Sequence, residues 1–124
     1  MRELIVRESP GRGRGVFAVR AFRAGELIEE CPVLVIPDRD IPLIDQTALW
    51  HYYFGWSGPE GTGAIGLGLA SLYNHSDQPN AECRKDIDAR VIRFVALRDI
   101  GEGEEIVFRY DTGSPGTPLW FEPR

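Results

Sequence analysis

The sequence has little cysteine, no long apolar run and no excess of basic charge. Its 124 residues include two cysteines, Cys31 and Cys83, with no C-x-x-C pair, which excludes a disulfide framework and the common zinc modules. We expect both to be buried thiols in a reducing compartment. No stretch approaches the ~18 apolar residues of a membrane span, and no signal-peptide segment precedes the first apolar run. The sequence therefore predicts a cytoplasmic protein with no membrane contact.

Charge and composition further restrict which class of protein this is and which fold it adopts. The 14 basic and 19 acidic side chains give a net charge of −5, which argues against direct nucleic-acid binding, because that requires cations to neutralise phosphates. The length suits one domain. The 14 glycines and 9 prolines indicate many turns and short strands, and the 3 Trp, 4 Tyr and 6 Phe argue against disorder. We expect a mostly β domain with few short helices and long irregular loops.

Apolar runs separated by turn residues predict the strands. Residues 37–42 and 57–63 are polar or rich in Gly and Pro, and are expected to be loops. The stretch 47–53 fits a short helical turn or a strand, because its periodicity favours neither. The predicted strands lie at residues 4–6, 16–19, 27–29, 33–36, 81–84, 89–97 and 105–108.

Four segments are candidates for a binding or catalytic site. Residues 61–66 match G-x-G-x-x-G, but a loop precedes them and further glycine follows, so we reject a dinucleotide site. Residues 11–15, Gly-Arg-Gly-Arg-Gly, fit either a backbone that a ligand can approach closely or a turn with two solvated arginines. Residues 74–80 include His75 but show no catalytic triad and no metal-ligand spacing, so they also fit a capped polar turn. Residues 104–110 fit an edge strand.

Taken together and in this order, the segments resemble the SET domain, the fold of protein-lysine methyltransferases. Residues 11–18 resemble the family's first glycine motif, and residues 22–28 resemble the turn and strand that follow it. Residues 74–80 resemble its N-H-S-x-x-P-N segment, and residues 100–110 resemble its I-x-x-G-E-E-L-x-F-x-Y strand. More loosely, residues 52–54 resemble an inner strand that carries an aromatic channel residue.

The resemblance implies a SET-domain fold of short curved β-sheets. The SET core would span residues 3–112 of a single domain, 1–124, and an aromatic-bearing tail, 113–124, would complete the cleft. Because the cysteine-rich flanking modules of many family members are absent from this sequence, the chain resembles a minimal, free-standing member of the bacterial or viral sort.

The resemblance also implies transfer of methyl groups from S-adenosyl-L-methionine to the ε-amine of a lysine in a basic protein or peptide. Tyr110 would be the catalytic residue at the methyl-transfer pore, Asn74 would hold the cofactor's amino group, and His75 would meet the adenine through its main chain. Phe108 would share the channel face of the strand with Tyr110 and leave room for more than one methyl. The implied cofactor-binding residues are Arg12, Gly13, Arg14, Gly15, Asn74, His75, Tyr110 and Trp120, and the implied channel residues are Tyr52, Phe108 and Phe121. No metal is expected.

Departures from the family pattern leave other functions open. Ser71 and its neighbours stand where Arg-Phe often precedes N-H-S, Asp77 replaces a frequent Cys, and Arg109 replaces the Asp before the last Tyr. The chain could therefore be a catalytically weak SET-like module that binds the cofactor or a basic peptide, or a nonenzymatic β scaffold. The acidic run 99–111 fits a landing surface for a Lys/Arg-rich peptide or a solvated turn. A homodimer could supply the cleft wall that flanking modules supply elsewhere.

Overall fold

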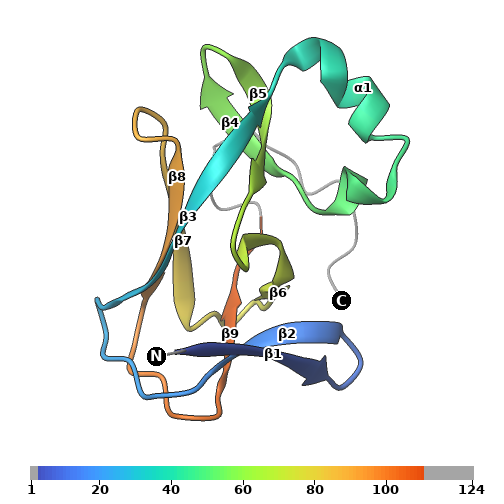
Figure 1. Cartoon of the computed structure of the whole chain (residues 1–124). Coiled ribbons are helices and arrows are strands. Elements are labelled where there is room, and N and C mark those ends of the chain that lie inside the picture. Colours follow the sequence, from blue (N-terminus) through green and yellow to red (C-terminus); the bar gives the residue numbers. More distant parts are fainter. Residues whose placement is uncertain (1–2, 111–124) are drawn as a thin grey trace.

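A five-stranded antiparallel sheet with β3 at its centre forms the larger part of the fold (Figure 1). The computed structural model describes residues 3–110. The first half of β3 (Leu27–Ile36) pairs with β8 (Val91–Ala96), which pairs with β7 (Ala81–Asp86). The second half pairs with β5 (Gly61–Gly66), which pairs with β4 (Phe54–Gly58). One long strand thus serves two hairpins, which lie towards its opposite ends.

A smaller sheet joins strands from both ends of the described chain. Its order is β1 (Leu4–Ser9), β2 (Gly13–Ala18), β9 (Glu105–Phe108) and β6 (Asn74–His75). β1, β2 and β9 pair antiparallel, whereas β6 pairs with β9 in parallel. This sheet therefore brings together the three segments that the sequence analysis selected, although they lie far apart in the chain.

Helical structure among residues 3–110 consists of four short turns: η1 (Asp38–Asp40), α1 (Ile41–Ile44), η2 (Ala48–His51) and η3 (Ala70–Leu72). The loop predicted at 37–42 is wrong, because η1 and the start of α1 lie there. Pro42 is tolerated since the first turn of a helix leaves its N–H groups unbonded. The undecided stretch 47–53 begins as a helical turn, where the Thr47 hydroxyl accepts a hydrogen bond from the Leu49 N–H at 3.1 Å.

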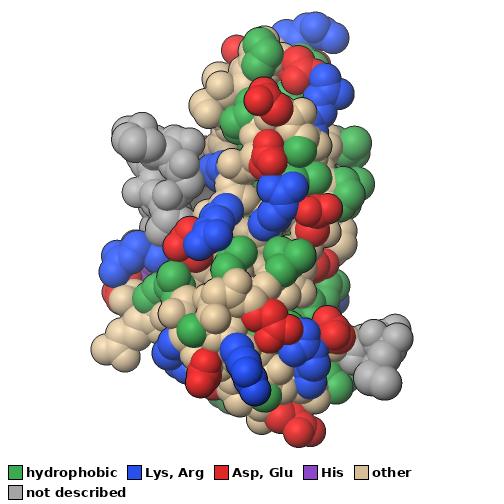
Figure 2. Space-filling model, turned by 90° about the vertical axis from the view of Figure 1, so that its left-hand side faces the viewer, with side chains coloured by type: hydrophobic (Ala, Val, Ile, Leu, Met, Phe, Trp, Pro, Cys, Tyr) green, Lys and Arg blue, Asp and Glu red, His purple; other side chains and the backbone are tan. Residues whose placement is uncertain are grey.

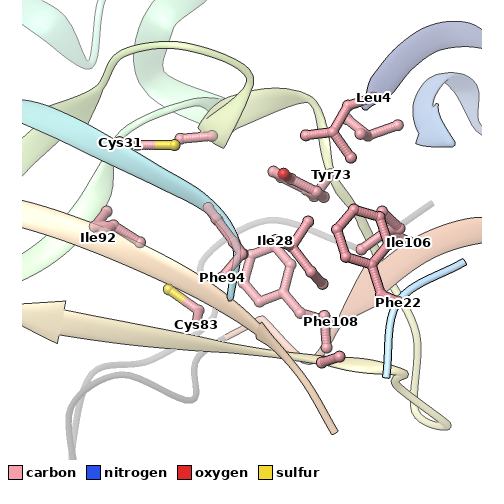
Figure 3. Packing of buried hydrophobic residues seen from close by; sticks show 14 of the residues in the cluster. Leu4, Phe22, Ile28, Cys31, Tyr73, Cys83, Ile92, Phe94, Ile106 and Phe108 are labelled. Atoms are coloured by element: carbon pink, nitrogen blue, oxygen red, sulfur yellow. The ribbon is translucent and has the colours of Figure 1, made fainter. Parts of the chain in front are cut away.

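Buried side chains from both sheets form one core (Figure 3). The rings of Tyr73 and Phe94 stack with their centroids 4.2 Å apart, and Ile106 of β9 is fully buried in the same core. Cys31 and Cys83 are buried and not bonded to each other, as predicted, and burial raises the pKa of the Cys83 thiol to about 12. The mostly β fold class is confirmed. None of the described helices has the length and apolar content to cross a membrane.

The Gly/Pro-rich stretch 57–66 is a hairpin. The loop predicted at 57–63 is wrong, because residues there end β4, turn, and begin β5. A Cβ on Gly61 would overlap the carbonyl oxygen of Ile36, and one on Gly63 would lie 2.7 Å from Cδ1 of Ile41. The G-x-G-x-x-G spacing therefore reflects close packing of β5 against its neighbours.

Charged side chains of both signs alternate on the face shown in Figure 2 and do not gather by sign. Ion pairs link neighbouring strands: Arg93 of β8 contacts Glu30 at 2.7 Å and Asp86 at 2.8 Å. The described residues on this face thus form no single-sign patch of the kind that binds a polyanion.

We predict that Gly61→Ala lowers the free energy of unfolding by about 1–3 kcal/mol, the usual cost of overpacking. The added Cβ would overlap a backbone carbonyl that cannot move without disturbing the β3–β5 pairing. Gly101→Ala is the matched control, because a Cβ there meets Glu104 Oε1 only at 3.9 Å, and it should change stability by less than about 0.5 kcal/mol. Urea denaturation measures both. Equal stability of the two variants would contradict the packing role of Gly61.

Candidate active site

Three segments that are distant in sequence meet at the side-chain amide of Asn74. In the smaller sheet, β9 lies between β2 and β6. Asn74 Nδ2 donates to the carbonyl oxygen of Arg14 on β2 at 3.0 Å and to Glu105 Oε2 on β9 at 2.8 Å. The glycine-rich, Asn-His-Ser and Glu-Glu segments are therefore tied together at one group.

The orientation of the Asn74 amide is determined by these two bonds. Both hydrogens of Nδ2 are used, each by an atom that can only accept. Oδ1 has no hydrogen-bond partner among residues 3–110, and the residue is 7% exposed. Oδ1 is therefore an acceptor available to a ligand that carries N–H groups.

Asn80 holds the segment after β6 against β9. Its Oδ1 accepts the Val107 N–H at 2.9 Å, and its Nδ2 donates to the Glu105 carbonyl at 2.8 Å. The backbone adds two bonds from this segment to β9, from Ser76 N–H to the Phe108 carbonyl at 3.1 Å and from Asn80 N–H to the Val107 carbonyl at 3.2 Å. Asn80 is 1% exposed, so it is an internal substitute for a strand partner.

The Glu105 carboxylate is held from three directions. Oε1 accepts from the Ser9 hydroxyl at 2.7 Å and lies 3.8 Å from Nη1 of Arg12, and Oε2 accepts from Asn74. A Cβ on Gly15 would overlap this carboxylate, so a glycine is what allows it to lie against β2.

The structure also separates the residues predicted from the glycine motif. Arg12, Arg14 and Gly15 all lie around Glu105 or Asn74. Gly13 instead pairs with Ser9 at the turn end of β2, and with Gly15 it lies inside the strand, not in a turn before it.

The imidazole of His75 positions the backbone of Tyr110. The Tyr110 N–H donates to His75 Nδ1 at 3.0 Å. A backbone N–H can only donate, so Nδ1 carries a lone pair and the ring proton is on Nε2. Nε2–H in turn donates a hydrogen bond to Asp77 Oδ1 at 3.0 Å. With both ring nitrogens engaged, His75 serves as a positioning side chain.

The Tyr110 hydroxyl is fixed by the backbone just before Asn74. It donates to the carbonyl oxygen of Tyr73 at 2.8 Å. Tyr73 is itself buried, and its hydroxyl donates to Glu29 Oε1 at 2.7 Å. Burial, followed by the nearby Glu29 carboxylate, raises the pKa of Tyr73 far above its usual range. Glu29 of the larger sheet thus anchors the residue that holds Tyr110.

Aromatic rings surround Phe108 at the end of β9. Phe108 lies 5.1 Å from Tyr110, 5.3 Å from Phe94 and 6.4 Å from Phe54, between ring centroids. Phe108 and Tyr110 are therefore neighbours, as their spacing predicts, and Figure 3 shows Phe108 beside Phe94 in the core. Phe54 is the ring of the 52–54 stretch that reaches Phe108. Tyr52 is exposed, its carbonyl accepts from the Ser71 hydroxyl at 2.7 Å, and its channel role stays a prediction.

Two of the departures from the family pattern contact each other. Nη2 of Arg109 donates to the carbonyl oxygen of Asp77 at 3.3 Å, and Nη1 lies 3.7 Å from Asp77 Oδ1. Asp77 therefore contacts both His75 and the residue before Tyr110. These two departures therefore join the segment after β6 to the residue after β9.

Several side chains of the acidic run make hydrogen bonds within the protein. Asp99 accepts from the Ala24 N–H at 2.9 Å, and Glu104 accepts from Arg98 at 2.6 Å and from the Gly101 N–H at 3.0 Å. Glu105 points into the Asn74 network. These contacts favour a structural role for the run over a landing surface.

Some predicted site residues lie outside residues 3–110, namely Trp120 and Phe121 in the tail. Glu105, Tyr73 and Phe54 have site contacts that the sequence analysis did not assign. The second Glu of the Glu-Glu pair could have been singled out, because it alternates with Ile106 and faces away from the core. No group of three or more His, Cys, Asp or Glu side chains that could hold a metal lies within the described residues.

Comparison with known proteins supports the class that this fold and site define. The SET-domain family model matches residues 13–111. A histone-lysine N-methyltransferase of Schizosaccharomyces pombe, specific for lysine 37 of histone H3, is 37% identical over 120 residues, which cover 96% of this chain and 77% of the yeast protein. The chain therefore belongs to the SET-domain family of protein-lysine N-methyltransferases.

Solved structures agree in fold. A Plasmodium falciparum protein assigned as a histone methyltransferase matches with a TM-score of 0.72 and 29% identity, over 91% of this chain and 96% of that chain. A chain of a humanized Chaetomium thermophilum Polycomb Repressive Complex 2 matches with a TM-score of 0.69 and 21% identity, over 91% of this chain and 15% of that chain. The SET fold is thus confirmed, whereas the bacterial or viral type and the cytoplasmic location stay predictions.

We predict that Asn80→Ala destabilises the protein strongly. It leaves the Val107 N–H and the Glu105 carbonyl without their side-chain partner, at about 1–3 kcal/mol for each unsatisfied buried group. Gln78→Ala is the matched control, because this exposed side chain lies in the same segment, and it should cost less than about 0.5 kcal/mol. Urea denaturation of both variants tests the difference, and an Asn80→Ala variant as stable as Gln78→Ala would refute the role of Asn80.

Proposed function

We propose that this protein methylates a lysine of a histone-like basic protein tail and uses S-adenosyl-L-methionine as the methyl donor. The observation that carries the proposal is the joint fixing of Asn74, His75 and Tyr110 by hydrogen bonds around β9. The family match and the substrate named for the S. pombe relative support the same activity and substrate class.

The residues around Asn74 fit this cofactor. The sulfonium group of S-adenosyl-L-methionine supplies an activated methyl. The ammonium group at its amino-acid end needs hydrogen-bond acceptors from the protein. The unpartnered Oδ1 of Asn74 is such an acceptor. We infer that the main chain of residues 12–15 and of His75 completes the binding surface, as the resemblance implies.

The hydrogen bond of Tyr110 determines what its hydroxyl can do. The single hydroxyl proton is given to the Tyr73 carbonyl, so in a hydrogen bond with the substrate amine the Tyr110 oxygen is the acceptor. Tyr110 therefore orients a neutral lysine amine by accepting one of its N–H groups, which leaves the amine lone pair free to attack. It does not act as a base while that bond is kept.

The aromatic rings near Tyr110 supply the second requirement, an uncharged amine. A free lysine has a pKa near 10.4, so about one molecule in a thousand is neutral near pH 7.4. We infer that Phe108 and Tyr110, whose ring centroids lie 5.1 Å apart, desolvate the substrate ammonium and lower its pKa. Binding beside these rings thus favours the reactive form of the substrate.

The decisive experiment incubates the protein with S-adenosyl-L-methionine and histone H3 and analyses the products by mass spectrometry. Methylated lysine supports the proposal. Binding of S-adenosylhomocysteine without methyl transfer to H3 or to mixed basic proteins would instead identify the interaction module that the departures left open. If the protein neither binds S-adenosylhomocysteine nor transfers a methyl group, the proposal is overturned.

We predict that Tyr110→Phe lowers turnover by tenfold or more, on the scale of a lost transition-state hydrogen bond, while cofactor affinity stays the same. Tyr53→Phe is the matched control, because it removes a tyrosine hydroxyl that donates to the exposed Asp45 side chain at 2.8 Å and not to the Tyr73 carbonyl. Steady-state kinetics and calorimetry measure both effects. Unchanged turnover in Tyr110→Phe would remove this hydroxyl from the mechanism.

We predict that the wild type adds more than one methyl and that Phe108→Tyr shifts the product towards monomethyl-lysine. A hydroxyl at this position, or a water held by it, would fill the room that a methylated amine needs to turn. Phe94→Tyr is the control, because Phe94 is fully buried in the same ring cluster and should lower stability without changing the ratio of products. Mass spectrometry of one peptide decides the matter, and a wild type that stops at one methyl contradicts the prediction.

A further inference from the structure

The Glu105 carboxylate accepts a hydrogen bond from the Asn74 amide nitrogen, and its charge goes beyond what is needed to orient that amide. Any acceptor at the position of Oε2 would keep the amide nitrogen turned inwards. A carboxylate adds a full negative charge at 2.8 Å from that nitrogen. A charged acceptor makes a stronger bond than a neutral one, and it polarises the amide so that the opposite atom, Oδ1, becomes a better acceptor.

The charge on Glu105 has a single, long ion pair among its described neighbours. Ser9 and Asn74 give it hydrogen bonds without charge, and its single ion-pair partner, Arg12, lies at 3.8 Å with a side chain 34% exposed. The Glu105 side chain itself is 17% exposed, and a carboxylate this far from water favours a nearby cation. The structure thus places a carboxylate with one long ion pair against the nitrogen of the Asn74 amide, whose Oδ1 is available as an acceptor.

The shape of β2 serves this arrangement. The carboxylate occupies the space that a Cβ on Gly15 would fill, so the glycine and Glu105 form one packing unit. Ser9, which is buried, anchors the far oxygen from β1. The carboxylate is therefore held by three strands and is not a mobile surface group.

We propose that Glu105 is a positioning residue that makes the Asn74 site selective for the positively charged amino group at the amino-acid end of the cofactor. The inference rests on the proposed function, since it assumes that this cofactor binds at Asn74. The charge of Glu105 attracts the ammonium, and its hydrogen bond keeps Asn74 Oδ1 turned towards it.

Binding calorimetry with two ligands tests the proposal. One is S-adenosylhomocysteine, and the other is its analogue in which the α-amino group is replaced by hydrogen. Glu105→Gln keeps the size and an acceptor but removes the charge. It should weaken S-adenosylhomocysteine about tenfold, the scale of a charged hydrogen bond, and weaken the analogue less than twofold. Glu104→Gln, the neighbouring charge that bonds Arg98, is the control and should change neither affinity.

Each outcome separates this inference from the proposed function. Equal weakening of both ligands would make Glu105 a general scaffold, and no weakening of either would remove it from the site; both results overturn the inference alone. A wild type that binds neither ligand overturns the proposed function. If Glu105→Gln does not fold, Ser9→Ala loosens the same carboxylate while keeping its charge. It should then weaken S-adenosylhomocysteine more than the analogue, and parallel loss would again count against the inference.

Discussion

The replacement of strand pairing by the side chain of Asn80 is the constraint on which the rest of the structure depends. β6 has two residues, too few to hold a parallel strand by ladder bonds alone. Asn80 bonds the Val107 N–H and the Glu105 carbonyl with its amide, and its own carbonyl accepts the Leu97 N–H at 2.9 Å. The side chain of this one buried residue therefore fastens the segment 76–80 to β9, and its backbone carbonyl fastens the segment to the residue after β8, which ties the small sheet to the large one.

Because the Asn80 hydrogen bonds hold the segment after β6 against β9, the site residues of the two strands lie next to each other. Asn74 and His75 form β6, whereas Phe108 ends β9 and Tyr110 follows it. Hydrogen bonds join the two sides: the His75 ring accepts one from the Tyr110 N–H, and the Tyr73 carbonyl accepts one from the Tyr110 hydroxyl. The two strands that carry these residues are short, so the precision of the site also depends on these hydrogen bonds between them.

The strands and the order of the motifs could be predicted from the sequence because they depend on local apolar runs and turn residues. The strand at Glu105–Phe108 was predicted with its observed bounds. β6 could not be predicted, since two residues carry no periodicity, and its pairing arises from a side chain five residues after its end. The loops expected at 37–42 and 57–63 were wrong because proline in a first helical turn and glycine in a packed strand resemble loop residues in composition.

The site was predictable only where a motif marked it. Asn74, His75 and Tyr110 were found through the resemblance, whereas Glu105 was counted as one charge of an acidic run. Its meaning depends on Gly15 and Ser9, which are distant in sequence and whose contact with it is visible only in three dimensions. A short pattern alone was therefore a poor guide, because the glycines of 61–66 serve packing and the contacts of Glu105 leave no mark in its own segment.

The departures from the family pattern lose much of their weight once their contacts are known. Asp77 accepts a hydrogen bond from the His75 ring and another, at its backbone carbonyl, from Arg109, and His75 in turn accepts one from the Tyr110 N–H. Tyr73 has its hydroxyl in the core, where this hydroxyl donates a hydrogen bond to Glu29. A replacement that weakened the site would leave a buried donor or a charge without a partner, and these replacements have partners. The geometry therefore favours an enzyme that reaches the family's arrangement with other residues over a binding module that has lost it.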